Sequence, residues 1–475
     1  MKRNLCVVMS MMIVTAFLVS ACAPAAEPPP APAAAPAAEA EAGQEAEPET
    51  GNGDAGNGNA GDGGVVATHT SVGRGDGSNV VVYFSGSLNF TETRMYRLMY
   101  EYFHLNPDAN VTFEFQGAEH DEARRRIQLM AHTDELPHLF WESFSEVPVM
   151  AELGVMADLT ERIQGDSEWY NFFNPGALDN FTFNGRIRGT PDAADAMGFF
   201  YNQAIFNDLG LDIPVTWEDF LNAVVVIRDA GIVPIAHGGT DMWSIWGYNL
   251  FFHRYGYMEN HEAFLNQEFT FADSRMIDAF RRIQELADLG AFPENVTTLS
   301  HTHAMEMWRG GNAAIVTTGT WSLPGFRNVE ETPISDYIVF NWGPHFSDST
   351  YEQRVALKEY TAGTFVGRRL EEYPEAFEEA MRFLRWRHSP EGSAALIEQG
   401  GLPASRFYGG DLYIPRLTQM MLEFLEDEYL PRLQLAVLHD TTFQEPFWNA
   451  VTAVISGVIT PEEAARQVDN WNAGR

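Results

Sequence analysis

The chain has 475 residues, 45% of them hydrophobic, and its 66 acidic against 30 basic residues give a formal net charge of −36. A chain of this length exceeds what one hydrophobic core organises, so we expect at least two lobes. A surface this acidic repels DNA, RNA and anionic lipid headgroups, which argues against nucleic acid as a partner.

The first residues have the pattern of an export signal. Lys2 and Arg3 supply positive charge, and the apolar stretch Cys6–Val19 follows, which is short for a transmembrane helix. The tetrapeptide VSAC, ending at Cys22, resembles a bacterial lipobox, in which the cysteine is lipidated; an ordinary cleaved signal is the alternative. We predict a signal peptide over residues 1–22 with lipidation at Cys22. The mature chain would then contain no disulfide, because Cys22 would be its only cysteine.

Residues 23–78 are expected to form a disordered tether. The first half is rich in Ala, Pro and Glu and the second in Gly, Asn and Asp, with almost no large apolar residue. Such a segment buries too little apolar surface to order itself.

From Val80 onward, short apolar segments alternate with amphipathic ones. Apolar runs bounded by turn residues predict strands at Val80–Phe84, Val111–Phe115 and Leu136–Trp141. Apolar residues at helical spacing predict helices at Thr91–Phe103, Asp121–Ala131 and Val147–Met156. This alternation predicts an α/β fold with mainly parallel sheets.

The stretch from Gly189 to Trp246 has the densest local signals. A polar, proline-containing segment, Thr190–Asp195, leads into the apolar run Ala196–Tyr201. This run predicts a buried strand. Thr216 begins a capping box for a helix that Gly231 ends. A short strand and a loop with two tryptophans follow, at Val233–Ala236, Gly238, Gly239, Trp243 and Trp246.

The remaining chain continues the alternation. The expected strands are Ala313–Thr318, Tyr337–Trp342 and Thr361–Val366. The expected helices are two within Phe264–Leu289, then Ser300–Arg309, Glu375–His388, one beginning at Ser389 and one beginning at Thr460.

The order and spacing of these segments resemble the maltose-binding-protein-like family of bacterial extracellular solute-binding proteins, which supply carbohydrates to ABC importers. The shared motifs are Tyr201-Asn202 with Phe206 and Gly210, Pro214-x-Thr216-Trp217-x-x-Phe220, and Gly231-x-x-Pro234-Ile235-Ala236. The resemblance extends over most of the chain from Val80 to Trp471. It implies a two-lobe periplasmic-binding-protein-like α/β fold with a hinge and an interlobe cleft.

The resemblance also implies where the chain passes between lobes. The crossings would lie near Asp192–Asp195, Glu352–Tyr360 and Gly410–Pro415. Lobe I would then comprise residues 79–192 and 355–412, and lobe II residues 193–354 and 413–475.

Tryptophans at the ends of predicted strands are the strongest functional signal. Sugars need flat apolar surfaces for their C–H faces and polar groups for their hydroxyls. Ligands of α/β sheets bind outside the carboxyl ends of strands, where these side chains lie. The resemblance adds that Trp141 and Trp321 match family binding positions. The predicted ligand-binding residues are Trp141, Glu142, Asp192, Asp195, Trp243, Trp246, Thr320, Trp321 and Trp342.

Other chemical patterns are weaker. His301 and His303 are two apart on a predicted helix, which directs their rings apart, so we predict no metal site there. The run Arg124–Arg126 is expected to be a solvated surface. We find no Gly-x-Ser-x-Gly elbow or phosphate-binding Gly-Lys-Ser/Thr loop, and we predict no cofactor. Paired carboxylates of a glycosidase stay an open alternative.

The favoured hypothesis is a monomeric, lipid-anchored receptor on the outer face of the cytoplasmic membrane. It would bind a sugar or oligosaccharide in the cleft and deliver it to ABC transporter permease subunits, without being an enzyme. The alternatives are a lipid-anchored glycoside-active enzyme that uses cleft carboxylates, and an adhesive or sensory ectodomain.

Overall fold

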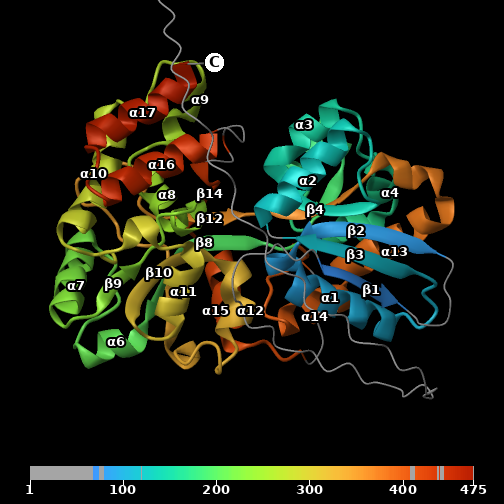
Figure 1. Cartoon of the computed structure of the whole chain (residues 1–475), viewed down its shortest axis with the longest axis horizontal. Coiled ribbons are helices and arrows are strands. Elements are labelled where there is room, and N and C mark those ends of the chain that lie inside the picture. Colours follow the sequence, from blue (N-terminus) through green and yellow to red (C-terminus); the bar gives the residue numbers. More distant parts are fainter. Residues whose placement is uncertain are drawn as a thin grey trace, which may run out of the picture. The chain divides into compact units, whose positions relative to one another are not determined.

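The computed structural model describes residues 68–73, 80–118, 120–406, 412–435, 438 and 443–473 (Figure 1). The predicted signal peptide, Cys22 and residues 23–67 lie outside the described residues. All described residues belong to one compact unit, Gly64–Arg475. None of the described helices combines the length and apolar composition that a membrane crossing requires.

The first of two large sheets is built from strands within residues 68–191 and one returning strand. Its order is β1 (Thr68–Gly73), β3 (Thr112–Ala118), β2 (Val81–Ser87), β4 (Leu139–Ser143), β13 (Ala362–Val366) and β7 (Gly189–Pro191). Neighbouring residues of a strand point to opposite faces, so Leu139 joins one hydrophobic cluster and Phe140 the other.

Helices cover both faces of the first sheet. The larger cluster includes residues of α1 (Leu88–Leu105), α13 (Pro374–His388) and α14 (Pro390–Glu398), and the smaller one those of α2 (His120–His132) and α3 (Val147–Glu152). The remaining elements of this part are α4 (Thr160–Gly165), α5 (Ser167–Phe172), and the paired strands β5 (Thr182–Phe183) and β6 (Arg186–Ile187).

The second sheet is organised around β8 (Asp195–Asn202), in which all eight residues are buried. Its order is β14 (Leu430–Arg432), β12 (Val355–Glu359), β8, β10 (Ala313–Gly319) and β9 (Val233–Ala236), with β11 (Ile338–Asn341) also paired to β8. Phe199 and Phe200 of β8 point into separate hydrophobic clusters on the two faces.

One face of the second sheet carries most of the remaining helices. They are α6 (Gln203–Asp208), α7 (Trp217–Asp229), α8 (Asn249–Arg254), α9 (His261–Leu265), α10 (Ser274–Asp288), α16 (Gln444–Ile455) and α17 (Pro461–Ala473). The other face packs against α11 (His301–Arg309), α12 (Leu323–Phe326) and α15 (Arg416–Glu426).

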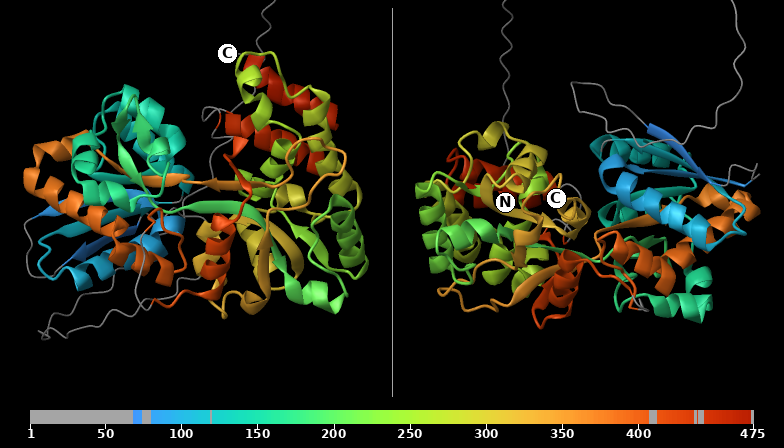
Figure 2. Two further views of the ribbon diagram at one scale, coloured as in Figure 1. Left: turned by 180° about the vertical axis from the view of Figure 1, so that it is seen from behind. Right: turned by 90° about the horizontal axis from the view of Figure 1, so that it is seen from below.

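The chain passes between the two sheets more than once. In both views of Figure 2, the blue and teal N-terminal segments group with orange ones, and the green and yellow segments with the red C-terminal helices. β8 and β12 pair antiparallel where Asp195 faces Glu359, and β13 then continues into the first sheet (Figure 1). Strands therefore connect the two halves, as expected for a two-lobe fold.

The sheets are mixed, and the prediction of mainly parallel sheets is wrong. β2 is parallel to β3 and β4, but β1, β7 and β13 pair antiparallel with their neighbours. In the second sheet β8 is antiparallel to β10, β11 and β12. The apolar runs alone carry no information on strand direction, which depends on how the crossing strands re-enter each sheet.

Two segments differ from the predicted organisation. Thr68–Gly73, assigned to the tether, forms β1 and pairs with β3 from Thr68↔Gly117 to Gly73↔Thr112, so the tether prediction is wrong for these residues. Thr and Val favour strand backbone, and the existing edge supplies the hydrogen bonds. Val355–Glu359, assigned to lobe I, pairs with β8 and β14 of the second sheet.

Candidate functional site

The passage from the first sheet to the second places Asp195 at the start of β8. Its Oδ1 lies 3.4 Å from the hydroxyl of Thr320, and its Oδ2 accepts hydrogen bonds from the backbone N–H of Thr361, at 3.3 Å, and from the Thr361 hydroxyl. Thr361 lies between β12 and β13, so one carboxylate joins two crossing segments. The Thr320 hydroxyl also accepts a bond from the N–H of Ala196 at 3.3 Å. These contacts join Asp195 to the segment between β12 and β13 and to the turn that follows β10.

Asp192 follows β7 and is held by an ion pair. Nη2 of Arg387 lies 2.6 Å from Asp192 Oδ1, which also accepts a hydrogen bond from the Thr364 hydroxyl at 3.0 Å. Arg387 Nη1 donates to the same hydroxyl at 2.8 Å. The Arg387 side chain is only 1% exposed, so a buried positive charge on α13 compensates the carboxylate.

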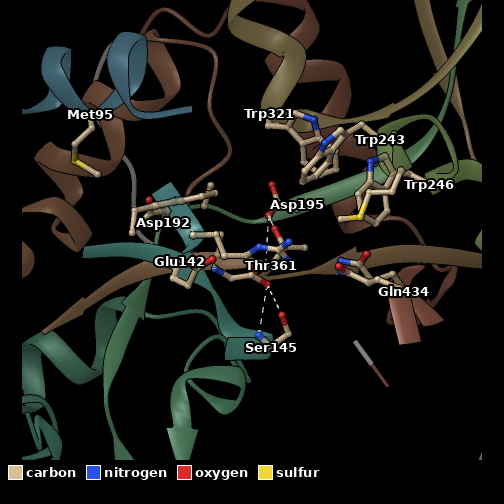
Figure 3. A pocket seen from close by; sticks show the side chains of 17 residues that line it. Met95, Glu142, Ser145, Asp192, Asp195, Trp243, Trp246, Trp321, Thr361 and Gln434 are labelled. Atoms are coloured by element: carbon tan, nitrogen blue, oxygen red, sulfur yellow. Dashed lines mark hydrogen bonds between the residues drawn. The ribbon is translucent and has the colours of Figure 1, made fainter. Parts of the chain in front are cut away.

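Glu142 projects from β4 and is buried, with 1% exposure. Its Oε1 accepts a hydrogen bond from the backbone N–H of Ser143 at 2.9 Å. The hydroxyls of Ser143 and Ser145 lie 3.0 Å apart, and Ser143 donates to the carbonyl of Thr361 at 3.3 Å. Figure 3 shows Glu142 and Asp192 on the side of the pocket away from the labelled tryptophans.

Three tryptophans gather on the opposite side of the pocket (Figure 3). Trp243 and Trp246 have ring centroids 5.8 Å apart, and Trp246 and Trp321 have centroids 5.9 Å apart with planes at 80°. Trp246 is buried, whereas Trp243 and Trp321 are partly exposed. The rings therefore form one apolar wall that keeps part of its surface available.

Short-range hydrogen bonds hold the loop that carries Trp243 and Trp246. Asp241 accepts from the N–H of Trp243 at 3.2 Å and from the N–H of His301, at the start of α11, at 2.9 Å. Ser244 Oγ lies 3.0 Å from His301 Nδ1, and burial lowers the pKa of His301 to about 4. His301 is consequently neutral at pH 7 and acts as a fixed partner of the loop.

Gly319 gives Trp321 its position. A Cβ atom at residue 319 would lie 2.2 Å from the Trp321 ring, far inside van der Waals contact. The indole therefore folds back over the end of β10, and any side chain at 319 would displace it.

These groups line one cavity, with about 940 Å³ of empty space including open solvent at its mouth. Its lining residues are Met95, Arg124, Trp141, Glu142, Ser143, Ser145, Asp192, Ala193, Asp195, Met242, Trp243, Trp246, Trp321, Thr361, Ala362, Gln434 and Gln444. Both halves of the fold contribute. An apolar wall opposite carboxylates, hydroxyls and amides suits a ligand with apolar faces and hydroxyl edges.

Opposite Asp195, where β12 pairs with β8, Glu359 is 4% exposed. Neither of its carboxylate oxygens has a hydrogen bond of ordinary geometry within the described residues. Burial raises the pKa of Glu359 to about 8; the negative charge of Asp195 adds to this effect, and the polar groups of Gln434 oppose it in part. The crossing strands thus contain a second, largely protonated carboxyl group next to Asp195.

The structure brings together most of the predicted site residues, namely Trp141, Glu142, Asp192, Asp195, Trp243, Trp246 and Trp321. Thr320 does not line the cavity, and its hydroxyl instead contacts Asp195.

Trp342 differs from its prediction as a ligand-binding residue. It is 2% exposed, does not line the cavity, and donates from Nε1 to Asp427 at 2.8 Å. Its ring packs among aromatic residues between β11 and α15, including Phe340 and Phe424. A position at a strand end does not by itself separate a cleft residue from a core residue.

Several lining residues were not predicted. The run Arg124–Arg126 was expected to be solvated, but Arg124 lines the cavity and Arg126 donates to Ser85 at 2.7 Å, so the prediction is wrong for both. Three consecutive helix residues point in three directions, and of these three Arg125 is exposed whereas Arg124 and Arg126 are partly buried. Gln434 and Gln444 follow no motif in the sequence, and only the tertiary fold brings them to the cavity.

The sequence matches the family described as bacterial extracellular solute-binding proteins over residues 104–406, and the chain belongs to this family. This is a family of substrate-binding proteins and not of enzymes.

Individual relatives are more distant. The chain is 25% identical over 155 residues to a multiple sugar-binding protein of Streptococcus mutans, covering 31% of this chain and 37% of that one. It is 25% identical over 222 residues to an uncharacterized ABC transporter extracellular-binding protein of Pyrococcus horikoshii, covering 46% and 50%. The chain thus spans half or less of the length of these curated relatives.

Solved structures share the fold over nearly their whole length. A chitin oligosaccharide binding protein superposes with a TM-score of 0.74 at 20% identity, covering 84% of this chain and 99% of that chain. A bacterial solute receptor with a substrate preference for β-D-galactopyranose superposes with a TM-score of 0.70 at 14% identity, covering 83% and 98%. These similarities establish a two-lobe periplasmic-binding-protein fold.

Proposed function

We propose that this protein captures a sugar or oligosaccharide in the cavity described above and delivers it to the membrane permease of an ABC importer. The observation that carries the proposal is one cavity with Trp243, Trp246 and Trp321 on one side and the carboxylates Glu142 and Asp192 on the other (Figure 3). Indole faces bind the C–H surfaces of a pyranose, and carboxylates accept hydrogen bonds from its hydroxyls.

We further propose that the ligand is bound by closure of two lobes. The first lobe would comprise the first sheet and its helices, and the second lobe the second sheet. Their hinge would lie at residues 192–194, 360–361, 399–406 and 412–415, where the described chain leaves one set of packed elements and joins the other. Closure would bring Glu142 and the tryptophans onto the same ligand, and the closed form would be the one presented to the permease.

A binding screen tests the function. Thermal melting should be followed with neutral and charged mono- and oligosaccharides at millimolar concentration, and hits titrated by calorimetry. A true ligand raises the melting temperature because it binds the folded state alone. Chromatography of the same mixtures after overnight incubation should return the saccharide intact. Turnover would favour the glycoside-active alternative, and the absence of any saccharide ligand would contradict the proposal.

We also propose that the protein acts outside the cytoplasm as a monomer, anchored through lipidated Cys22. Cys22→Ser should move the protein from the membrane fraction to the soluble fraction or leave it unprocessed. Cys6→Ser is the matched control, because residue 6 lies in the part that cleavage would remove, and it should leave fractionation unchanged. Membrane retention of Cys22→Ser would exclude the lipid anchor.

A further inference from the structure

A second cavity adjoins the sugar cavity and shares Trp321 with it. It contains about 1730 Å³ of empty space, open solvent included, between α1 and α14 on one side and α11 and α12 on the other. Helix α1 passes along both cavities, with Met95 at the first and Arg97 and Tyr100 at the second. A ligand longer than one ring can therefore extend from the first cavity into the second past one indole.

Three arginines line this second cavity. Arg97 lies on α1, Arg309 ends α11 and Arg327 follows α12. Within the described residues none of them forms an ion pair with a carboxylate, although many other arginines of this acidic chain do. Their positive charges therefore converge on the cavity without a compensating anion in contact.

Arg327 and Arg309 are held in place by uncharged groups. Arg327 Nη1 donates to the backbone carbonyl of Glu398 at 2.5 Å, and the Arg309 guanidinium lies over the Phe326 ring, 5.7 Å from its centroid. A Cβ at Gly325 would lie only 3.0 Å from Arg309 Nη2, so this glycine leaves room for the guanidinium. Both side chains are thus positioned before any ligand arrives.

The electrostatics of the two half-buried arginines favour an anion. Burial lowers the pKa of Arg309, and the charges of Glu331 and Glu306 oppose this effect only in part. Burial also lowers the pKa of Arg327; Tyr413 opposes the effect, and the positive charge of Arg97 adds to it. An anion between Arg97 and Arg327 would relieve this repulsion. Glu101, Glu331 and Glu398 also line the cavity and are exposed, as Arg97 is, so water screens the charges of all four, whereas Arg309 and Arg327 are partly buried.

We propose that the second cavity is a subsite for the carboxylate of a uronic acid unit, in the same saccharide whose neighbouring ring lies against Trp321. The planar guanidinium matches a carboxylate in bidentate geometry, which a hydroxyl does not reproduce. Tyr100, 61% exposed beside Arg97 on α1, offers an aromatic face for the acidic ring. The proposal rests on the sugar-binding function above and narrows its ligand to acidic oligosaccharides.

The test compares pairs of related saccharides of which one member carries carboxylates and the other is uncharged. Suitable pairs are trigalacturonic acid with its methyl ester, and glucuronic-acid-substituted xylotriose with xylotetraose. Dissociation constants should be measured by calorimetry at low and high sodium chloride for the wild type, for Arg97→Gln with Arg327→Gln, and for Arg125→Gln. The last variant removes an exposed charge outside both cavities.

The wild type should bind at least one acidic member about tenfold or more tightly than its neutral partner, and salt should reduce this ratio. The double variant should bring the ratio close to one, whereas Arg125→Gln should leave it unchanged. A ratio of one in the wild type, or a ratio that the double variant preserves, would overturn the acidic subsite. Binding of neutral saccharides only would overturn it and leave the sugar-binding function intact, whereas failure of every saccharide would overturn both.

Discussion

The tryptophans and the carboxylates of the sugar cavity are held by different kinds of contact. Trp243 and Trp321 lie in turns after strands, kept there by the Asp241 cap and by the space over Gly319. Asp192 and Asp195 lie where the chain crosses between sheets, bonded to Arg387 and Thr361. Substitutions in the aromatic wall should therefore cost little stability. Substitutions on the carboxylate side, meaning Asp192, Asp195 and their partners, should reduce both stability and ligand binding.

The largest expected effect comes from removing the partner of Asp192. Arg387→Ala should lower the free energy of unfolding by about 3–5 kcal/mol, because it leaves a buried carboxylate without its counter-charge. Denaturant unfolding at pH 7 measures this. Arg369→Ala, an exposed arginine, is the control and should change stability by less than about 0.5 kcal/mol. Equal effects of the two changes would show that the carboxylate side is not integral to the fold.

The second prediction is a substitution that raises the free energy of unfolding, by an amount that depends on pH. Burial raises the pKa of Glu359 from its ordinary value of 4.5 to about 8 in the folded protein. The stability associated with its protonated form is fully present below about pH 4.5 and is lost as pH rises through about 8. Glu359→Gln does not titrate, so at pH 9 it should be more stable than the wild type by about 2–5 kcal/mol, since each pKa unit corresponds to about 1.4 kcal/mol.

Thermal melting at pH 5 and pH 9 tests this expectation for Glu359. The two proteins should melt alike at pH 5, and the variant higher at pH 9. Glu352→Gln, at an exposed glutamate just before β12, should show no such difference. Wild type and Glu359→Gln melting alike at both pH values would contradict the raised pKa.

The aromatic wall and the carboxylate side also differ in how well sequence predicts them. Trp141, Trp243, Trp246 and Trp321 follow apolar runs and glycines, which are local signals. Asp192 and Asp195 belong to a polar segment that the sequence shows, but their partners Arg387 and Thr361 are far away in sequence. Trp342 has the same local signals as Trp321, yet packing against Phe424 places it in the core.

The same limit applies to the fold. The apolar runs located most strands and helices, because burial periodicity is local. Strand direction, the pairing of β1 with β3, and the place of β12 beside β8 depend on contacts between distant segments. Gln434 and Gln444 reach the cavity for the same reason, without any pattern in their own neighbourhood.

The third expected effect is on binding and not on stability. Trp321→Ala removes a partly exposed ring from the wall and should weaken binding of the saccharide identified in the screen by about tenfold, since an aromatic contact contributes about 1–2 kcal/mol. Trp321→Phe keeps an aromatic face and should lose less. Calorimetric titration and thermal melting on both variants provide the measurement. A lower melting temperature with unchanged affinity would assign Trp321 to packing.

The smallest expected effect tests whether the position of the Trp321 ring matters as well as its presence. Gly319→Ala keeps the indole, but the new Cβ would lie 2.2 Å from it and must push it away from the end of β10. The backbone at 319 has φ −124°, which alanine adopts without strain, so the change acts through the ring alone. We expect binding to weaken by about three- to fivefold, or about 0.7–1 kcal/mol. Gly165→Ala, where a Cβ meets no atom within 4 Å, should leave affinity unchanged. If Gly319→Ala binds as the wild type does, the ring tolerates displacement, and the wall owes its affinity to apolar surface and not to a fixed geometry.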